Sequence, residues 1–239
     1  MGTRLAGQPA TGVREHREGC PVGRARDRMT EINRMTEIIR VQNGPGVAET
    51  IGAIIATSFH EQEISAWTIP PDDDRRRVMP PLFSMAAESA LVHGEVHATA
   101  DLSAVAVWFP QGAEPLPETP DRDARVEAFA GPHWERIRRM EEEMDKRHPQ
   151  DPHHYLAFLA VLPGHQGRRM GTRLLAEYHR KLDEAGMPAY LEASSTRSRR
   201  LYLRHGYQDL GDPIFMPDGP PMFPMWRPSR STASAPLTS

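Results

Sequence analysis

A loop in the last third of the chain carries two glycines and two arginines, between an apolar segment and a stretch with helical spacing. Its residues are Gln166, Gly167, Arg168, Arg169, Met170, Gly171 and Thr172. Unpaired backbone N–H groups at a helix N-terminus, together with the helix dipole, favour an anion there. Glycines let a ligand approach the backbone closely, and arginine side chains suit phosphate. The pattern therefore predicts a phosphate-binding loop.

Two common phosphate-binding signatures fit this loop poorly. A nucleotide P-loop ends in Gly-Lys-Ser/Thr, and the loop has no lysine. A dinucleotide fingerprint needs three glycines at fixed spacing and an acidic residue about twenty positions further on. Glu192 lies about that far from Gly171, but the three-glycine spacing is missing.

The sequence VLPGHQGRRMGTRLL, residues 161–175, resembles the pyrophosphate-binding motif Q/R-x-x-G-x-G/A of the GNAT superfamily of acyl-CoA-dependent N-acetyltransferases. Gln166 and Gly171 match the first and last positions of the motif, and Arg169 stands where the middle glycine is usual. The resemblance implies that acetyl-CoA is the cofactor and that the amides of residues 167–172 bind its pyrophosphate. At the position of Arg169 it implies either a changed backbone contact or a phosphate contact by the side chain.

Residues 188–207, PAYLEASSTRSRRLYLRHGY, resemble the next strand, helix and strand of the same family. Tyr202 and the following Gly206-Tyr207 match the family pattern Y-x-x-x-G-[FY]. Many members have a cofactor-binding asparagine where Ser198 stands, so Ser198 is expected at the cofactor. The resemblance also implies that the preceding strand binds the pantetheine arm through its backbone, at Leu159, Ala160 and Val161.

Acetyl transfer to an amine requires a polarised thioester, a neutral amine and a proton for the departing thiolate. On the resemblance, Tyr202 is the expected acid, because a phenol with a pKa near 10 is protonated at neutral pH. Glu192 is the candidate base, acting directly or through water, and no covalent enzyme intermediate is needed. A histidine is the alternative base, because its pKa near 6.5 suits proton abstraction. The histidine candidates are His93, His97, His133, His153 and His154.

Metal chemistry is not expected. The histidines do not recur three or four times at metal-ligand spacing. The adjacent pair His153-His154 would point to opposite faces of a strand.

The acceptor site should lie in residues that precede the loop. Its candidate walls are Trp67 and Trp108, with Phe59 and Phe83, and its candidate cation attractors are Glu61, Glu63 and residues 72–74; core packing and solvated faces are the alternatives. The element order resembles antibiotic-modifying members of the family such as the puromycin N-acetyltransferases. This implies a small-molecule amine, such as an antibiotic or another natural product. A protein acetyltransferase for lysine or an N-terminus remains an alternative, as does a non-catalytic acyl-CoA-binding module.

The candidate site residues must be positioned by strands and helices. The order of these predicted elements indicates an α/β (α+β) fold with a central mixed, mostly antiparallel sheet flanked by helices. The resemblance adds splayed parallel strands at the acyl-CoA site. Strands are predicted at residues 37–42, 95–99, 104–109, 155–161, 189–192 and 222–226, with another beginning at Tyr207. Helices are predicted at residues 47–60, 72–93, 121–146, 170–185 and 197–204. Prolines are expected to interrupt the second helix at Pro80-Pro81 and to divide the third at Pro132.

Composition narrows the class of protein further. The chain has 239 residues and a net charge of −3, without the basic excess of a nucleic-acid binder. Its single cysteine favours a reducing cytoplasm, and no apolar run is long enough to cross a membrane. Disordered tails are expected at residues 1–34 and 228–239, around one GNAT-type acetyltransferase domain at 35–227. The domain is expected to be a monomer or a homodimer.

Overall fold

The computed structural model describes residues 37–112, 117 and 120–230 of the 239-residue chain. The predicted N-terminal tail at residues 1–34 lies outside the described residues. So does most of the predicted C-terminal tail, from residue 231 onward.

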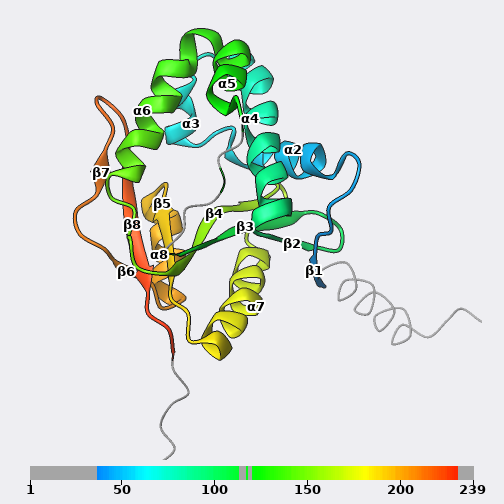
Figure 1. Cartoon of the computed structure of the whole chain (residues 1–239), viewed down its shortest axis with the longest axis vertical. Coiled ribbons are helices and arrows are strands. Elements are labelled where there is room, and N and C mark those ends of the chain that lie inside the picture. Colours follow the sequence, from blue (N-terminus) through cyan, green and yellow to red (C-terminus); the bar gives the residue numbers. More distant parts are fainter. Residues whose placement is uncertain (1–36, 113–116, 118–119, 231–239) are drawn as a thin grey trace, which may run out of the picture. The chain divides into compact units, whose positions relative to one another are not determined.

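A mixed sheet runs through the described structure (Figure 1). Its strands are β1 (Ile38–Arg40), β2 (Glu95–Thr99), β3 (Ala104–Gln111), β4 (His153–Val161), β5 (Ala189–Ala193), β6 (Gln208–Asp209), β7 (Ile214–Phe215) and β8 (Pro221–Arg227). Their order across the sheet is β1-β2-β3-β4-β5-β8-β6, and β7 pairs with β8. Neighbouring strands are antiparallel except β4 and β5, which are parallel. The predicted mixed, mostly antiparallel sheet is confirmed.

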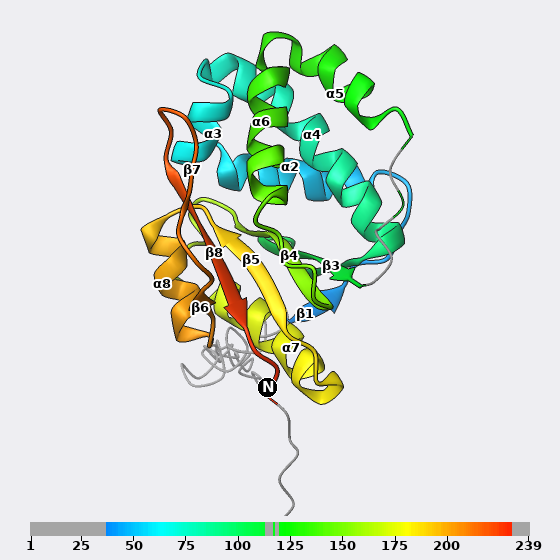
Figure 2. The same cartoon turned by 60° about the vertical axis from the view of Figure 1, so that its left-hand side comes forward.

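Helices cover both faces of the sheet (Figure 2). They are α2 (Val47–Phe59), α3 (Glu63–Thr68), α4 (Asp72–His93), α5 (Arg122–Ala130), the short 3₁₀ helix η1 (Gly131–His133), α6 (Trp134–Asp145), α7 (Met170–Ala185) and α8 (Thr196–Arg204). One face of the sheet packs against α7 and α8, and the other face packs against α2 and α4, with α3, α5 and α6 beyond them.

Most predicted elements appear where the sequence pattern placed them, and Pro132 divides α5 from α6 as expected. The interruption at Pro80-Pro81 was wrong, because α4 continues through both prolines. The carbonyls that lose their N–H partners belong to Arg76 and Arg77, and these residues are exposed, so water can satisfy them. The short elements α3 and β7 were not predicted.

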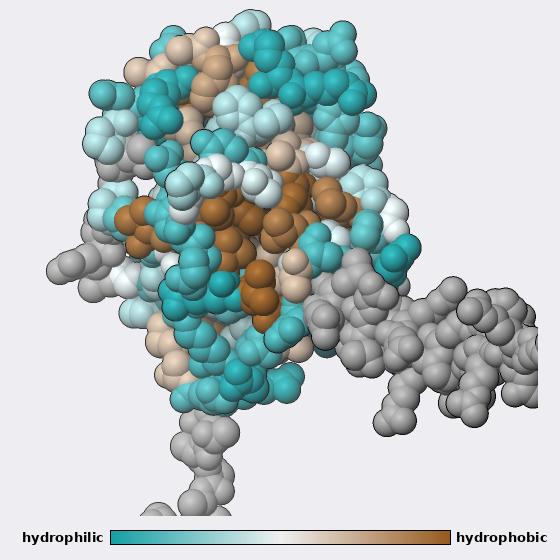
Figure 3. All heavy atoms as spheres, turned by 90° about the vertical axis from the view of Figure 1, so that its right-hand side faces the viewer, coloured by the Kyte–Doolittle hydropathy of each residue, from teal (hydrophilic) through white to brown (hydrophobic). Residues whose placement is uncertain are grey.

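The surface of the described residues is mixed in character. None of their helices is both long enough and apolar enough to cross a bilayer. On the side that carries α2 and β2, apolar side chains form a band between polar ones (Figure 3). The large apolar side chains that are individually exposed among the described residues are Ile39, Val92, Leu203, Leu210 and Phe215.

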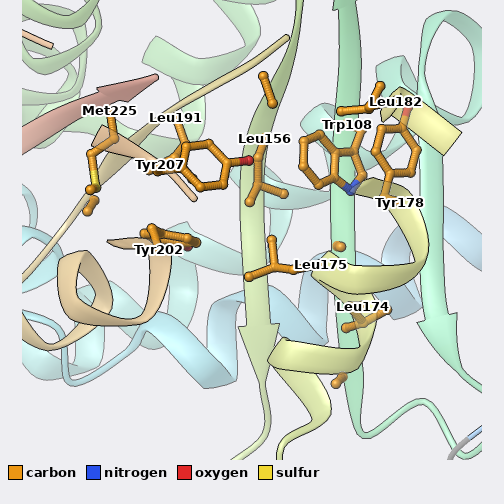
Figure 4. Close-up of a cluster of buried hydrophobic side chains, with 14 of the residues drawn as sticks. Trp108, Leu156, Leu174, Leu175, Tyr178, Leu182, Leu191, Tyr202, Tyr207 and Met225 are labelled. Atoms are coloured by element: carbon orange, nitrogen blue, oxygen red, sulfur yellow. The ribbon is translucent and has the colours of Figure 1, made fainter. Parts of the chain in front are cut away.

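The apolar core beneath α7 follows directly from helical spacing. Leu174, Leu175, Tyr178 and Leu182 recur on one helix face and are at most 1% exposed. The indole of Trp108 stacks on the ring of Tyr178 at 4.2 Å between centroids (Figure 4). This packing fixes α7 against the middle of the sheet and so fixes where the N-terminus of α7 lies.

Strand β4 has irregular pairing on both of its edges. Against β3 the register shifts, so that Val107 pairs with Phe158 and Trp108 with Leu156, and Ala157 is the extra residue of a bulge. Against β5, the described pairing consists of His154 with Ala189 and Tyr155 with Tyr190. The C-terminal half of β4 therefore leaves β5, and the predicted splay of the parallel strands is present.

Helices α2 and α4 approach closely where α2 has a glycine. An added Cβ at Gly52 would lie 2.3 Å from the Oγ atom and 2.5 Å from the backbone nitrogen of Ser84. Because backbone atoms cannot move away independently, a side chain at this position would push the two helices apart.

We expect Gly52→Ala to destabilise the protein by about 1–3 kcal/mol through overpacking, although alanine is the better helix former. Thermal or urea unfolding measures this. The control is Ala53→Gly at the exposed neighbouring position, where helix propensity alone predicts a loss of about 1 kcal/mol. If Gly52→Ala raised the free energy of unfolding, propensity would outweigh packing and the close approach would be unimportant.

Candidate active site

A cleft of about 550 Å³ lies beside the C-terminal half of β4, between β4 and the first turns of α7 and α8. Most residues predicted to hold the cofactor line it: Leu159, Ala160, Val161, Gln166, Gly167, Arg169, Met170, Gly171, Thr172 and Ser198. Arg168 is exposed and is not part of this lining. Residues from three separate elements and one loop are therefore brought together at the strand splay.

The N-terminus of α7 faces this cleft with free donors. Arg169 is its N-cap residue, and no side chain of the described residues caps the helix there. The first intrahelical bond runs from the N–H of Arg173 to the carbonyl of Arg169, so the N–H groups of residues 170–172 have no intrahelical acceptor. The first turn of α7 thus offers amide donors and the positive end of a helix dipole to an anion.

The conformation of Arg169 explains why a glycine is usual at its position. Its backbone is left-handed, with φ 62° and ψ 16°, a region that costs a non-glycine residue about 1 kcal/mol. Gly167 shares the positive φ, at 78°. The loop keeps the turn that two glycines would give and gains a guanidinium at the rim of the cleft.

The two other motif residues have local structural tasks. The side-chain amide of Gln166 donates to the carbonyl of Val161 at 3.3 Å, which ties the loop to the end of β4. At Gly171 an added Cβ would touch Leu159 at 3.5 Å, an ordinary contact distance. Gly171 is therefore not required by contact with β4, and it lines the cleft without a side chain.

Ser198 forms part of a capping box at the start of α8. Its backbone N–H donates to the hydroxyl oxygen of Ser195, and its own hydroxyl accepts from the N–H of Ser195. The serine at this position is thus explained by helix capping. It lines the cleft, but its hydroxyl is already engaged with Ser195.

Tyr202 projects from α8 into the base of the cleft and is 8% exposed. Its ring packs edge-on against Tyr207 at 5.7 Å (Figure 4). Burial raises the pKa of Tyr202 above its ordinary value of 10, so the phenol is fully protonated at neutral pH.

Glu192 lies on β5 and does not line the cleft. Its side chain is 1% exposed. Burial raises the pKa of Glu192 to about 7, and the hydroxyls of Tyr190 and Tyr155, which favour the charged form, offset only part of that effect. In the described structure, Oε1 of Glu192 has no partner at hydrogen-bond distance.

Two histidines lie near Glu192: His148, in the segment between α6 and β4, and His153, the first residue of β4. Nδ1 of His148 lies 3.9 Å from Oε1 of Glu192, and Nε2 of His148 lies 3.1 Å from Nε2 of His153. His153 was among the predicted base candidates, whereas His148 was missed. The one sequence signal for His148 is that three histidines fall within residues 148–154, and their spacing matches no single element.

The other histidine candidates for the base have partners elsewhere. His97 lies 3.2 Å from Glu95, and His133 lies 2.8 Å from Asp74. His154 lies 3.0 Å from the hydroxyl of Tyr178, on the α7 face of the sheet. None of these three histidines lines the cleft, and neither does His93.

The two tryptophans predicted to wall an acceptor pocket lie apart from the cleft. Trp108 is fully buried on the α7 face, because its indole stacks on Tyr178. The indole N–H of Trp67 donates to the carbonyl of Pro217 at 3.0 Å, and Arg136 lies over its ring. Both side chains thus pack between elements, the alternative that the sequence left open. Phe59 does line the cleft.

One group of potential metal ligands occurs among the described residues, formed by His60, Glu61 and Asp72. His60 and Asp72 already pair directly, with 2.7 Å between Nε2 and Oδ1. Arg76 also pairs with Asp72. These contacts account for the closeness of the three residues without an ion.

Residues 136–207 match the family model described as the acetyltransferase (GNAT) family. Two examples of solved structures that share the fold follow. One, from Corynebacterium glutamicum, is described as histone acetyltransferase HPA2 and related acetyltransferase; it is 24% identical, with a TM-score of 0.61, over 84% of this chain and 99% of that one. The other is arylalkylamine N-acetyltransferase 2 from Aedes aegypti, 12% identical with a TM-score of 0.58, over 80% of this chain and 99% of that one.

The matched residues include β4, the loop, α7 and α8, which form most of the cleft, whereas Ser58 and Phe59 of α2 line the cleft from outside the match. The match and the shared fold agree with the resemblance found in the sequence. The match over residues 136–207 therefore indicates a transferase enzyme with a GNAT-type acetyltransferase domain.

Proposed function

We propose that this enzyme transfers the acetyl group of acetyl-CoA to a primary amine of a small molecule by direct attack. The observation that carries the proposal is the cleft at the splay of β4 and β5, with the N-terminus of α7 at its rim and Tyr202 at its base. Such a cleft offers an anion site and a proton donor to one elongated ligand.

The residues present fit acetyl-CoA. From Leu156 onward, β4 is paired with β3 on one edge, while its other edge has left β5. The backbone groups of Leu159 and Val161 can therefore bind an amide-containing arm in the manner of an added strand. The amides of residues 170–172 and the side chain of Arg169 suit the pyrophosphate, and Arg197 and Arg204 add positive charge to the lining.

Tyr202 is suited to donate a proton to the leaving sulfur. Its phenol is buried in the base of the cleft, and its raised pKa makes it a proton donor rather than an anion. A buried donor aimed at developing negative charge stabilises the transition state more strongly than it would in water.

Glu192 is suited to accept a proton from the amine. A carboxyl with a pKa of about 7 is a stronger base than an ordinary glutamate and is still about half ionised at neutral pH. It lies on β5, the strand that borders the splay, and we propose that it takes the proton from the acceptor directly or through a water molecule, although its side chain is not part of the cleft lining.

A small acceptor is favoured by how deeply Glu192 lies. The acid is 1% exposed, and a protein lysine would need an open groove that leads to it. The neighbour from Aedes aegypti is named for arylalkylamines, which are small amines. An antibiotic or another natural product is the acceptor class that we propose.

The test of the function is a screen for coenzyme A release over a library of small amines and lysine peptides, with wild type and Tyr202→Phe. We expect release with small amines, and a loss of at least tenfold in kcat for Tyr202→Phe with little change in KM for acetyl-CoA. Release with lysine peptides alone would support a protein acceptor. Binding of acetyl-CoA without transfer to any amine would leave a non-catalytic binding module.

Arg169 provides a second prediction, because glycine can replace it without disturbing the turn. We expect Arg169→Gly to raise KM for acetyl-CoA about tenfold, through loss of a charge-assisted hydrogen bond worth about 1.5 kcal/mol. Folding stability should not fall, since glycine relieves the left-handed strain. The matched control is Arg168→Gly, next to it but outside the cleft lining. An equal effect of both variants would show that only general charge attracts the cofactor.

Glu192 provides a third prediction, about pH. As a base it must be ionised, so kcat/KM should fall about tenfold per pH unit below about 7 and level off above it. Glu192→Gln should remove this acid limb and lower the plateau. Amines of different pKa separate the two titrations, because a limb that belongs to the enzyme stays near pH 7 when the amine is changed.

The pH dependence of folding stability measures the raised pKa of Glu192 independently of enzyme activity. The folded pKa of Glu192 lies above the unfolded value of 4.5, so its protonated form stabilises the folded state below about pH 4.5. That contribution is lost as the pH rises through about 7. Glu192→Gln should therefore gain stability relative to wild type between pH 5 and pH 8, by about 3 kcal/mol at most. A constant difference across this range would contradict the raised pKa.

A further inference from the structure

The ring hydrogen atoms of His153 and His148 can be assigned from one backbone carbonyl. Nδ1 of His153 lies 2.7 Å from the carbonyl oxygen of Asp151. A carbonyl oxygen only accepts, so Nδ1 of His153 must carry the hydrogen. His153 is fully buried, and burial lowers its pKa, so the ring is neutral and its Nε2 is an acceptor.

This assignment determines the state of the second ring. Nε2 of His148, at 3.1 Å, must donate to the bare Nε2 of His153. Burial lowers the pKa of His148 to about 4, so its ring is also neutral at pH 7. Nδ1 of His148 is therefore a bare acceptor, and it lies 3.9 Å from Oε1 of Glu192. The separation exceeds a hydrogen bond, so a side-chain rotation that brings the two atoms together must precede proton transfer between them.

Acetyl transfer from acetyl-CoA to an alkylammonium releases one proton per turnover. An alkylammonium acceptor has three protons on its nitrogen, and the amide product keeps one. Of the two protons lost, the thiol of coenzyme A keeps one, and the other must reach solvent in each turnover. Glu192, at 1% exposed, is poorly placed to hand a proton to water, whereas the side chain of His148 is 19% exposed.

We propose that His148 carries this proton from Glu192 to solvent and that His153 holds His148 in the tautomer that can accept it. The inference rests on the proposed role of Glu192 as base. The O–H bond at Oε1 of Glu192 breaks as an N–H bond forms at Nδ1 of His148. The imidazolium then loses that proton to water, and the neutral ring returns with its hydrogen on Nε2.

The difference between the pKa values of Glu192 and His148 is small enough for the proton transfer to keep pace with turnover. The values of about 7 for Glu192 and about 4 for His148 make the transfer about a thousandfold unfavourable. A thousandfold penalty on a proton transfer between neighbouring atoms still leaves it faster than an ordinary turnover of about 10 s⁻¹. The groups that face Glu192 or influence its charge are Tyr190 of β5, Tyr155 of β4, His148 and, at the end of α6, Asp145.

Chemical rescue tests the transfer. We expect His148→Ala to lower kcat at least tenfold in weakly buffered solution, with KM little changed, and added imidazole to restore it. In the double variant with Glu192→Gln, imidazole should restore nothing, because no proton reaches the vacated site. The matched control is His133→Ala, a buried histidine paired with Asp74 and remote from the cleft lining, whose rate should not respond to imidazole. An unchanged kcat for His148→Ala, or a loss that imidazole does not repair, would overturn the proposal.

A second measurement needs no turnover. In protein labelled with ¹⁵N-histidine at pH 7, NMR should show hydrogen on Nδ1 in His153 and on Nε2 in His148. His153→Phe should release His148 into a mixture of tautomers. Hydrogen on Nδ1 of neutral His148 in the wild type would refute the assignment. If the tautomers are as assigned but no amine is acetylated, the proposed function fails while the arrangement of the histidines stands.

Discussion

The site depends on the early end of pairing between β4 and β5. Two residue pairs hold these parallel strands together, and beyond Tyr155 each strand follows its other neighbour. If pairing continued, the backbone groups near Leu159 would be satisfied within the sheet, and the cleft would be filled. The same divergence brings the N-terminus of α7 and the base of α8 to one opening. Cofactor binding, as we propose it, thus uses hydrogen-bonding capacity that the sheet leaves unused.

The two faces of the sheet around β4 and β5 differ in chemistry. On the α7 face, side chains such as Leu156 and Leu191 form an apolar core that gives rigidity. On the opposite face, Tyr155, Tyr190 and Glu192 lie together with the paired histidines. Because burial favours the neutral form of each group, this cluster shifts the pKa values of its side chains and disfavours their charged forms. Alternation along a strand allows both environments within a few residues of β5.

The sequence predicted those parts of the fold in which a local pattern decides the outcome. The apolar stripe of α7 and the cap residue Gly186 gave that helix its correct limits, and the alternating strands near Trp108 were placed well. The continuous α4 was missed because proline statistics do not reveal that the affected carbonyls face water. Trp108 itself was offered as a pocket wall, since aromatic content alone does not distinguish a ring in a cleft from a ring stacked in the core.

The candidate site was predictable to the extent that it is contiguous in sequence. The motif around Gly171 identified the cleft-lining loop, and Tyr202 followed from its own pattern. The partnership of His148 with Glu192 was not predictable, because the two residues come from different elements and meet only through the parallel pairing of β4 and β5. Likewise, the capping role of Ser198 depends on a hydroxyl geometry that composition cannot show.

Strand β8 holds β5 in place and so maintains the separation between β4 and β5. It pairs with every residue of β5, from Ala189 opposite Arg227 to Ala193 opposite Phe223. Strand β5 is therefore anchored on the side away from β4 and cannot slide across to close the gap. The opening is thus already formed in the free protein, so an incoming ligand meets a preorganised receptor and little conformational entropy is lost on association.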